Sequence, residues 1–143
     1  MYEKSGIIIN MLIHFYKIVN SFKTNPAKRD KLIIISLILS VIINLLIWIL
    51  IYTKLKPAII LSGKAEAFIP LHYNIYMGID SFGNWKWIFL LPVIGLLFTF
   101  ANGIISFLLY NKKKILSYFL SLTMPLIQIL LLLSTLFIVL INI

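Results

Sequence analysis

The chain has 143 residues, of which 62% are hydrophobic and 12% charged, and its mean hydropathy is +1.05. A water-soluble domain of this size could not bury that much apolar surface, so we expect lipid to surround it. The net charge of +9 would suggest nucleic acid as a partner of a soluble protein, but here the cations flank apolar runs. Membrane topology and anionic headgroups explain them more simply, so we expect no nucleic-acid partner. The absence of cysteine excludes disulfides, thiolate metal sites and a cysteine nucleophile.

The first element expected is an amphipathic helix over residues 7–22. Its apolar run is too short to cross a membrane, and the polar side chains Asn10, His14, Lys17 and Ser21 share one narrow helical face. This pattern favours a helix lying in the headgroup plane. A signal peptide is the alternative, but no small-residue cleavage site follows the apolar stretch.

Three apolar runs follow, over residues 32–52, 87–110 and 115–143. Each reaches the length of about 20 residues that crossing the roughly 30 Å hydrocarbon layer requires. The sequence therefore predicts an all-α integral membrane protein, with residues 1–143 forming a single membrane domain.

Charge predicts the orientation of these spans. Nine lysine and arginine residues lie before the first span and in the 111–114 turn, against four in the 53–86 loop. The positive-inside rule then places the N-terminus and the turn in the cytoplasm, and the 53–86 loop and the C-terminus outside the inner membrane. We interpret Lys112, Lys113 and Lys114 as pinning a tight cytoplasmic turn, with a phospholipid clamp or a partner-docking patch as alternatives.

The outer loop is expected to form a small β-ribbon. Residues 57–63 and 67–77 are rich in isoleucine, phenylalanine and tyrosine, which favours two strands. Pro70 restricts its strand to a sheet edge, and residues 78–84 are predicted to form a turn into the second span.

Small and polar residues form a stripe along each span, and we predict that the three stripes meet in one interior. Membrane helices associate through such close contacts and buried hydrogen bonds, because apolar side chains gain nothing by leaving lipid. A polar pathway through Asn44, Asn102 and Gln128 is the alternative reading. The stripes comprise Ser36, Ser40 and Asn44, then Gly95, Thr99, Asn102 and Gly103, then Ser117, Ser121 and Gln128.

His72 and Asp80 are the one candidate pair for chemistry. A zinc site would have to add Glu66, and a Ser-His-Asp arrangement would have to add Ser62 or Ser81, neither of which lies in a nucleophile elbow. We expect Asp80 to be a turn or cap residue and His72 to bond to loop backbone. The sequence predicts no catalytic residue, metal or cofactor.

The loop also carries a motif. It resembles the Pro-x-His-(Phe/Tyr)-Asn loop, followed by Gly and Asp, of an uncharacterised bacterial membrane module, a domain of unknown function also found at the front of toxin-immunity membrane proteins of the sporulation-delay type. The resemblance implies a loop outside the membrane between two spans. The matching residues are Pro70, His72, Tyr73, Asn74, Gly78, Asp80 and Gly83.

The function expected from these features is non-enzymatic. The outer loop is predicted to engage a partner protein or another envelope component, and the chain could also associate with copies of itself. A small transporter or permeation subunit that uses the intramembrane polar residues is the alternative. A membrane hydrolase using His72 and Asp80 ranks third.

Overall fold

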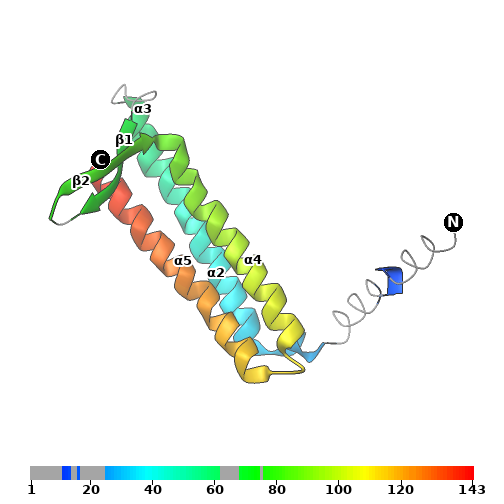
Figure 1. Cartoon of the computed structure of the whole chain (residues 1–143). Coiled ribbons are helices and arrows are strands. Elements are labelled where there is room, and N and C mark those ends of the chain that lie inside the picture. Colours follow the sequence, from blue (N-terminus) through cyan, green and yellow to red (C-terminus); the bar gives the residue numbers. More distant parts are fainter. Residues whose placement is uncertain (1–10, 14–15, 17–24, 62–67, 75) are drawn as a thin grey trace, which may run out of the picture.

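The computed structural model describes residues 11–13, 16, 25–61, 68–74 and 76–143. Three long helical segments lie side by side and a two-stranded ribbon covers one end of them (Figure 1). Of the predicted interfacial helix over 7–22, only Met11, Leu12, Ile13 and Tyr16 are described, and all four are helical. The rest of that prediction lies outside the described residues.

The three predicted apolar spans are helices long and apolar enough to cross a membrane. They cover Lys31–Leu61, Trp85–Leu109 and Lys114–Asn142. The first contains α2 (Lys31–Leu50), a π-helical turn (Ile51–Leu55) and α3 (Lys56–Leu61). The second contains a 3-10 turn (Trp85–Phe89) and α4 (Leu90–Leu109), and the third is α5 (Lys114–Asn142).

The predicted strand over 57–63 is wrong where the structure describes it, because Pro57 to Leu61 belong to α3, and residues 62 and 63 lie outside the described residues. Pro57 has no N–H group and would break a regular α-helical ladder. The π-helical turn just before it changes the hydrogen-bonding register, since the Lys56 N–H donates to the Ile51 carbonyl. The helix therefore continues past the proline and extends the first span beyond its predicted end.

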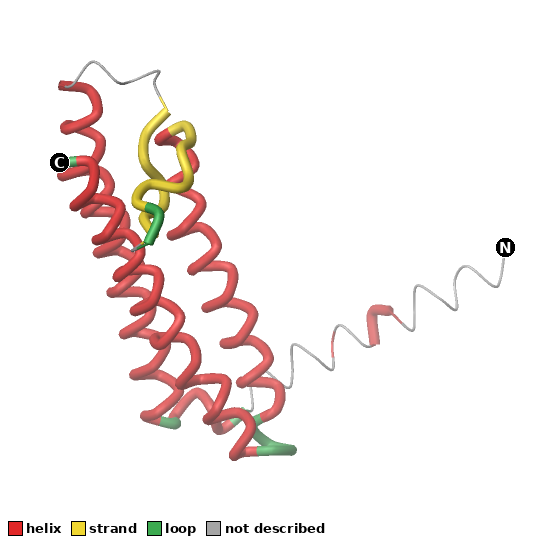
Figure 2. Tube along the Cα trace, turned by 60° about the vertical axis from the view of Figure 1, so that its left-hand side comes forward, coloured by secondary structure: helices red, strands yellow, loops and turns green. Residues whose placement is uncertain are grey.

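The observed ribbon pairs β1 (Phe68–Asn74) with β2 (Gly78–Asn84) in antiparallel fashion. Residues 78–84, predicted as a turn, thus form the second strand. Pro70 does lie on an edge, since both strands of a two-stranded sheet are edge strands. Figure 2 shows the ribbon at the end of the bundle where α4 begins, opposite the loop that joins α4 to α5.

The helices bury small polar side chains and expose large apolar ones. Ser40, Ser106, Ser117 and Ser121 are fully buried, whereas many leucine, isoleucine and phenylalanine side chains lie on the outside of the helices. A water-soluble bundle shows the opposite arrangement, with its apolar stripes facing inward.

Aromatic rings gather at the ribbon end of the bundle. The Phe89 ring lies 5.6 Å from the ring of Trp48, 5.7 Å from that of Tyr52 and 5.8 Å from that of Trp85, measured between centroids. At the opposite end lie the 3-10 turn Pro26–Arg29, the start of α2 and the 111–114 turn (Figure 1). The first two segments contain the cations Lys28, Arg29 and Lys31.

Candidate functional site

The ribbon is fixed to the bundle by one apolar face. Ile69 is 1% exposed and joins a core cluster that includes Ile88 from the 3-10 turn and Ile138 from α5. The Asn142 side-chain amide donates to the Pro70 carbonyl over 2.9 Å and so joins β1 to the end of α5. The strand β1, which carries Pro70, His72, Tyr73 and Asn74 of the loop motif, is therefore attached to α5.

The ribbon reverses direction between Asn74 and Gly78. The Asn74 side-chain oxygen accepts a hydrogen bond from the Tyr76 N–H at 2.9 Å, and Gly78 has a φ of 75°. Glycine adopts this left-handed conformation without steric cost. Gly83 has a different role, because a Cβ there would collide with the Leu71 side chain from the paired strand.

The hairpin places His72 beside Asp80. The His72 Nδ1 donates to the Asp80 Oδ1 over 2.6 Å, and the two side chains are 65% and 36% exposed. The expectation that Asp80 caps a turn and that His72 bonds to loop backbone is therefore wrong. Register irregularities on either side of His72 accompany this pairing. The backbone of Tyr73 pairs with Ile79.

A groove of about 650 Å³ lies between β1 and the last turns of α5. Leu71 and His72 line it from the strand, and Ser134 is the polar residue that α5 contributes. The remaining lining is apolar and consists of Leu130, Leu133, Phe137, Ile138, Leu140 and Ile141. An apolar groove with a few polar groups at its border is typical of a binding site.

The described residues offer limited chemistry beyond the histidine–aspartate pair. The pair can fix the tautomer and orientation of the imidazole. No hydrogen bond joins Ser81 to His72 in the described part of the chain, although their Cα atoms are partners in the ladder. No group of three or more His, Cys, Asp or Glu residues that could hold a metal lies within that part either. Ser62 and Glu66 lie outside it.

The middle of the bundle brings together residues from all three predicted stripes. The Asn44 amide donates to the Pro92 carbonyl at 2.9 Å and to the Gln128 Oε1 at 3.2 Å. The Gln128 amide donates in turn to the Thr99 hydroxyl at 2.9 Å. Gly95 lies against this network, because a Cβ there would lie 2.8 Å from the Gln128 Oε1.

A second polar cluster lies nearer the 111–114 turn. The Ser106 hydroxyl lies 2.9 Å from that of Ser117 and 2.7 Å from that of Ser121. Ser40 and Ser36 are also buried, and the Ser40 hydroxyl donates to the Ser36 carbonyl within α2. These hydroxyls allow the helix backbones to approach closely.

Two stripe residues lie apart from both clusters. The Asn102 amide donates to the Thr123 hydroxyl at 3.1 Å rather than to Asn44 or Gln128. A Cβ added at Gly103 would meet Met124 and Leu37 at ordinary contact distances. The structure thus places Asn44 and Gln128 together and leaves Asn102 at a separate contact.

A further cluster at the cation-rich end was missed by the sequence analysis. The Asp30 Oδ2 accepts hydrogen bonds from the hydroxyls of Tyr110 and Tyr118, each at 2.7 Å. The Lys114 Nζ lies 5.3 Å and 5.6 Å from the centroids of these two rings. Asp30 also caps α2, since its Oδ1 accepts from the Leu32 N–H at 3.0 Å. The sequence signal that could have located this cluster was Asp30 itself, an acidic residue at the N-cap position of the first span.

We call the cluster of Asp30, Tyr110, Tyr118 and Lys114 the clamp. It joins the start of α2 to the end of α4 and the start of α5. The hydrogen bond from Tyr118 is the main cause that holds the pKa of Asp30 below its ordinary value; burial opposes it, and the bond from Tyr110 adds to it. The bond to Asp30 raises the pKa of Tyr110 for the same reason. Nearby, the Asn25 amide donates to the Phe107 carbonyl at 2.6 Å.

Comparisons of the chain with protein-family models, curated proteins and solved structures found no match. The resemblance of the loop motif to the bacterial membrane module therefore stays a prediction.

Proposed function

We propose that the chain is a multi-pass protein of the bacterial inner membrane that uses its outer ribbon to engage an amphipathic envelope component. The three long helices would cross the bilayer, with the 111–114 turn in the cytoplasm and the ribbon outside. The exposed apolar side chains of these helices support the proposal that they cross the bilayer. The concentration of cations at the end opposite the ribbon supports the proposed orientation.

The groove beside His72 and Asp80 is the observation that carries the binding proposal. Its α5 lining runs from Leu130 to Ile141. The helical rise from the first to the last of these residues is about 16 Å, roughly half of the hydrocarbon thickness of a bilayer. A hydrocarbon chain in the outer half of the membrane fits this length, and its polar end would reach His72 and Asp80.

The surface of the ribbon favours a protein partner as a second candidate. Tyr76 is 93% exposed and Met77 is 83% exposed at the tip of the hairpin. Large exposed side chains of these types are typical of protein-binding surfaces. A partner could dock on the tip while the groove remains occupied from the membrane side.

The transport alternative has less support. Asn44 and Gln128 bond to each other and to neighbouring groups, whereas Asn102 bonds to Thr123. Within the described residues, no buried side-chain nitrogen or oxygen lacks a hydrogen-bond partner. Such contacts favour helix packing over a polar pathway.

A groove-filling substitution tests the binding proposal. Ser134→Trp places a large ring in the groove, whereas Leu122→Trp places it on an exposed position of α5 that is not part of the lining. Each variant is extracted in mild detergent, and the co-purifying small molecules are measured by mass spectrometry. We expect the wild type and Leu122→Trp to retain a molecule that Ser134→Trp loses and that His72→Ala retains less. Equal retention by all four proteins, or retention by none, would contradict the proposal.

A further inference from the structure

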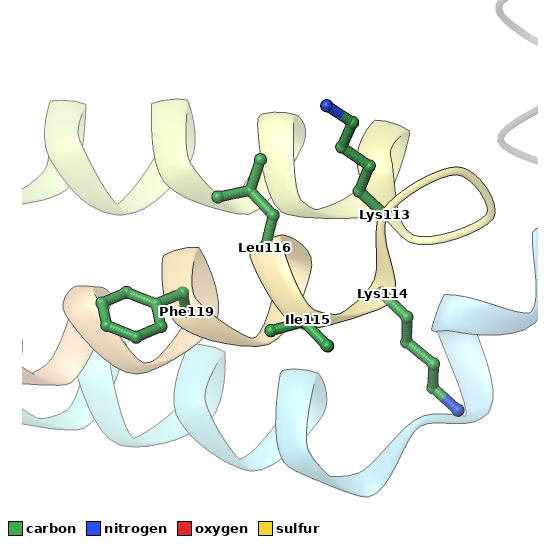
Figure 3. A pocket seen from close by; sticks show the side chains of 5 residues that line it. All are labelled: Lys113, Lys114, Ile115, Leu116 and Phe119. Carbon is green, nitrogen blue, oxygen red and sulfur yellow. The ribbon is translucent and has the colours of Figure 1, made fainter.

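A second groove lies at the opposite end of the bundle, along the first turns of α5. Its volume is about 540 Å³, and it is lined by Lys113, Lys114, Ile115, Leu116 and Phe119. Figure 3 shows the two lysine side chains extending to opposite sides of the helix start, with the three apolar side chains beyond them.

The two lysines differ in what they contact. Lys114 lies over the rings of Tyr110 and Tyr118, which bond to Asp30, so its charge contributes to the clamp. The Lys113 side chain makes no hydrogen bond, ion pair or ring contact with any residue that the structure describes. Its ammonium group is therefore available to a ligand.

The apolar part of the groove lies on the first turns of α5, directly after Lys113. Leu116 and Phe119 line the groove beyond Lys113, and they are three residues apart on α5, so they are neighbours on the helix surface. They are 45% and 70% exposed. From Lys114 to Phe119 the helix rises about 7.5 Å, so a charged group at Lys113 and an apolar chain on α5 can bind together.

We propose that this groove binds one anionic phospholipid from the cytoplasmic leaflet. The lipid phosphate would pair with the Lys113 ammonium, and the start of an acyl chain would pack on Leu116 and Phe119. Charge complementarity identifies the occupant, because Lys112 and Lys113 add positive charge where an apolar surface meets the headgroup layer. The inference rests on the proposed membrane placement and is independent of the groove beside His72.

The test measures lipid binding to the full-length protein. Phosphatidylglycerol or phosphatidylcholine is titrated into the protein in non-ionic detergent, and the bound fraction is measured by native mass spectrometry. We expect tighter binding of phosphatidylglycerol by the wild type. Lys113→Gln should weaken it about fivefold, the loss expected for one lysine near an anionic lipid. Lys113→Arg should retain the preference.

Two further variants distinguish a site from a general charge effect. Lys28→Gln removes an exposed cation at the same end that is not part of the groove lining, so it should leave binding unchanged. Phe119→Ala should weaken binding of phosphatidylglycerol without altering net charge. Equal losses in Lys28→Gln and Lys113→Gln, no preference for phosphatidylglycerol, or unchanged binding in Lys113→Gln would overturn the proposal. Ser134→Trp should bind this lipid normally, which separates this test from that of the outer groove.

Discussion

Gly95 of α4 lies where side chains from α2 and α5 approach its backbone at the polar network. A Cβ at this position would lie 2.8 Å from the Gln128 Oε1, 2.9 Å from Leu131 and 3.0 Å from the Asn44 amide nitrogen. Gly95→Ala should therefore separate the helices or break the Asn44–Gln128 bond. We expect a loss of about 1–3 kcal/mol in stability, measured by thermal denaturation of the detergent-solubilised protein.

Gly103 on the same helix provides the matched control. A Cβ there would lie 3.6 Å from the Met124 sulfur and 3.9 Å from Leu37, which are ordinary contact distances. Gly103→Ala should leave the melting temperature nearly unchanged. If both alanine variants melt at the wild-type temperature, the close approach at Gly95 contributes nothing to stability.

Asp30 makes the stability of the cation-rich end depend on pH. Because the pKa of Asp30 is lowered in the folded protein, its contribution to the free energy of unfolding is fully present above the ordinary pKa of 3.8. This contribution is lost as the pH falls below 3.8 through the lowered pKa. Tyr118→Phe removes the largest cause of the shift, so acid should destabilise this variant less steeply than the wild type. Melting temperatures measured across this pH range check the effect, and Asp30→Asn should lack it. An Asp30→Asn variant with the wild-type pH dependence would contradict the assignment.

The contrast between the polar network and the histidine–aspartate pair shows what sequence spacing can predict at the residue scale. Ser36, Ser40 and Asn44 repeat every four residues, so helical geometry alone places them on one face. The contact between His72 and Asp80 depends instead on the register of a hairpin. Bulges beside His72 alter that register, and no sequence rule locates them.

At the scale of elements, the strand predicted over 57–63 was wrong because a proline and β-branched residues favour a strand locally, whereas the helix continues through them. Pro57, Ile59 and Ile60 are typical of an extended segment when local preference alone is considered. The π-helical turn over Ile51–Leu55 instead accommodates the proline and extends the helix. In addition, Ile59 is 2% exposed in the core beneath the ribbon. Tertiary burial therefore outweighed local preference.

The attachment of the ribbon to α5 gives a prediction for this element. The Asn142 amide bridges the Pro70 carbonyl and the Ile138 carbonyl, each at 2.9 Å. Asn142→Ala should loosen β1 without unfolding the helices, because the hydrogen bonds among Asn44, Gln128 and Thr99 that join the three helices do not involve Asn142. We expect faster amide hydrogen exchange in β1 and β2, with exchange in α4 unchanged. Asn111→Ala, an exposed asparagine in the α4–α5 turn, is the control. Equal exchange rates in the ribbon of both variants would contradict the role of Asn142.

At the scale of the whole molecule, the length of three uncharged apolar runs predicted the three long helices. Long uncharged runs can form few structures other than membrane-spanning helices, because backbone groups in lipid must be bonded internally. The three helices thus followed from hydropathy. The clamp around Asp30 and the two grooves did not, since they depend on how separate helices and strands are placed beside one another.

The central claim is that the ribbon and the 111–114 turn lie on opposite sides of a membrane. Because the chain has no cysteine, Ser81→Cys and Lys112→Cys each introduce a single reactive thiol at an exposed position. A membrane-impermeant maleimide added to intact cells should label Ser81→Cys, and should label Lys112→Cys only after the membrane is permeabilised. Labelling of Lys112→Cys alone in intact cells would contradict the account, as would recovery of the protein in the supernatant after membranes are pelleted.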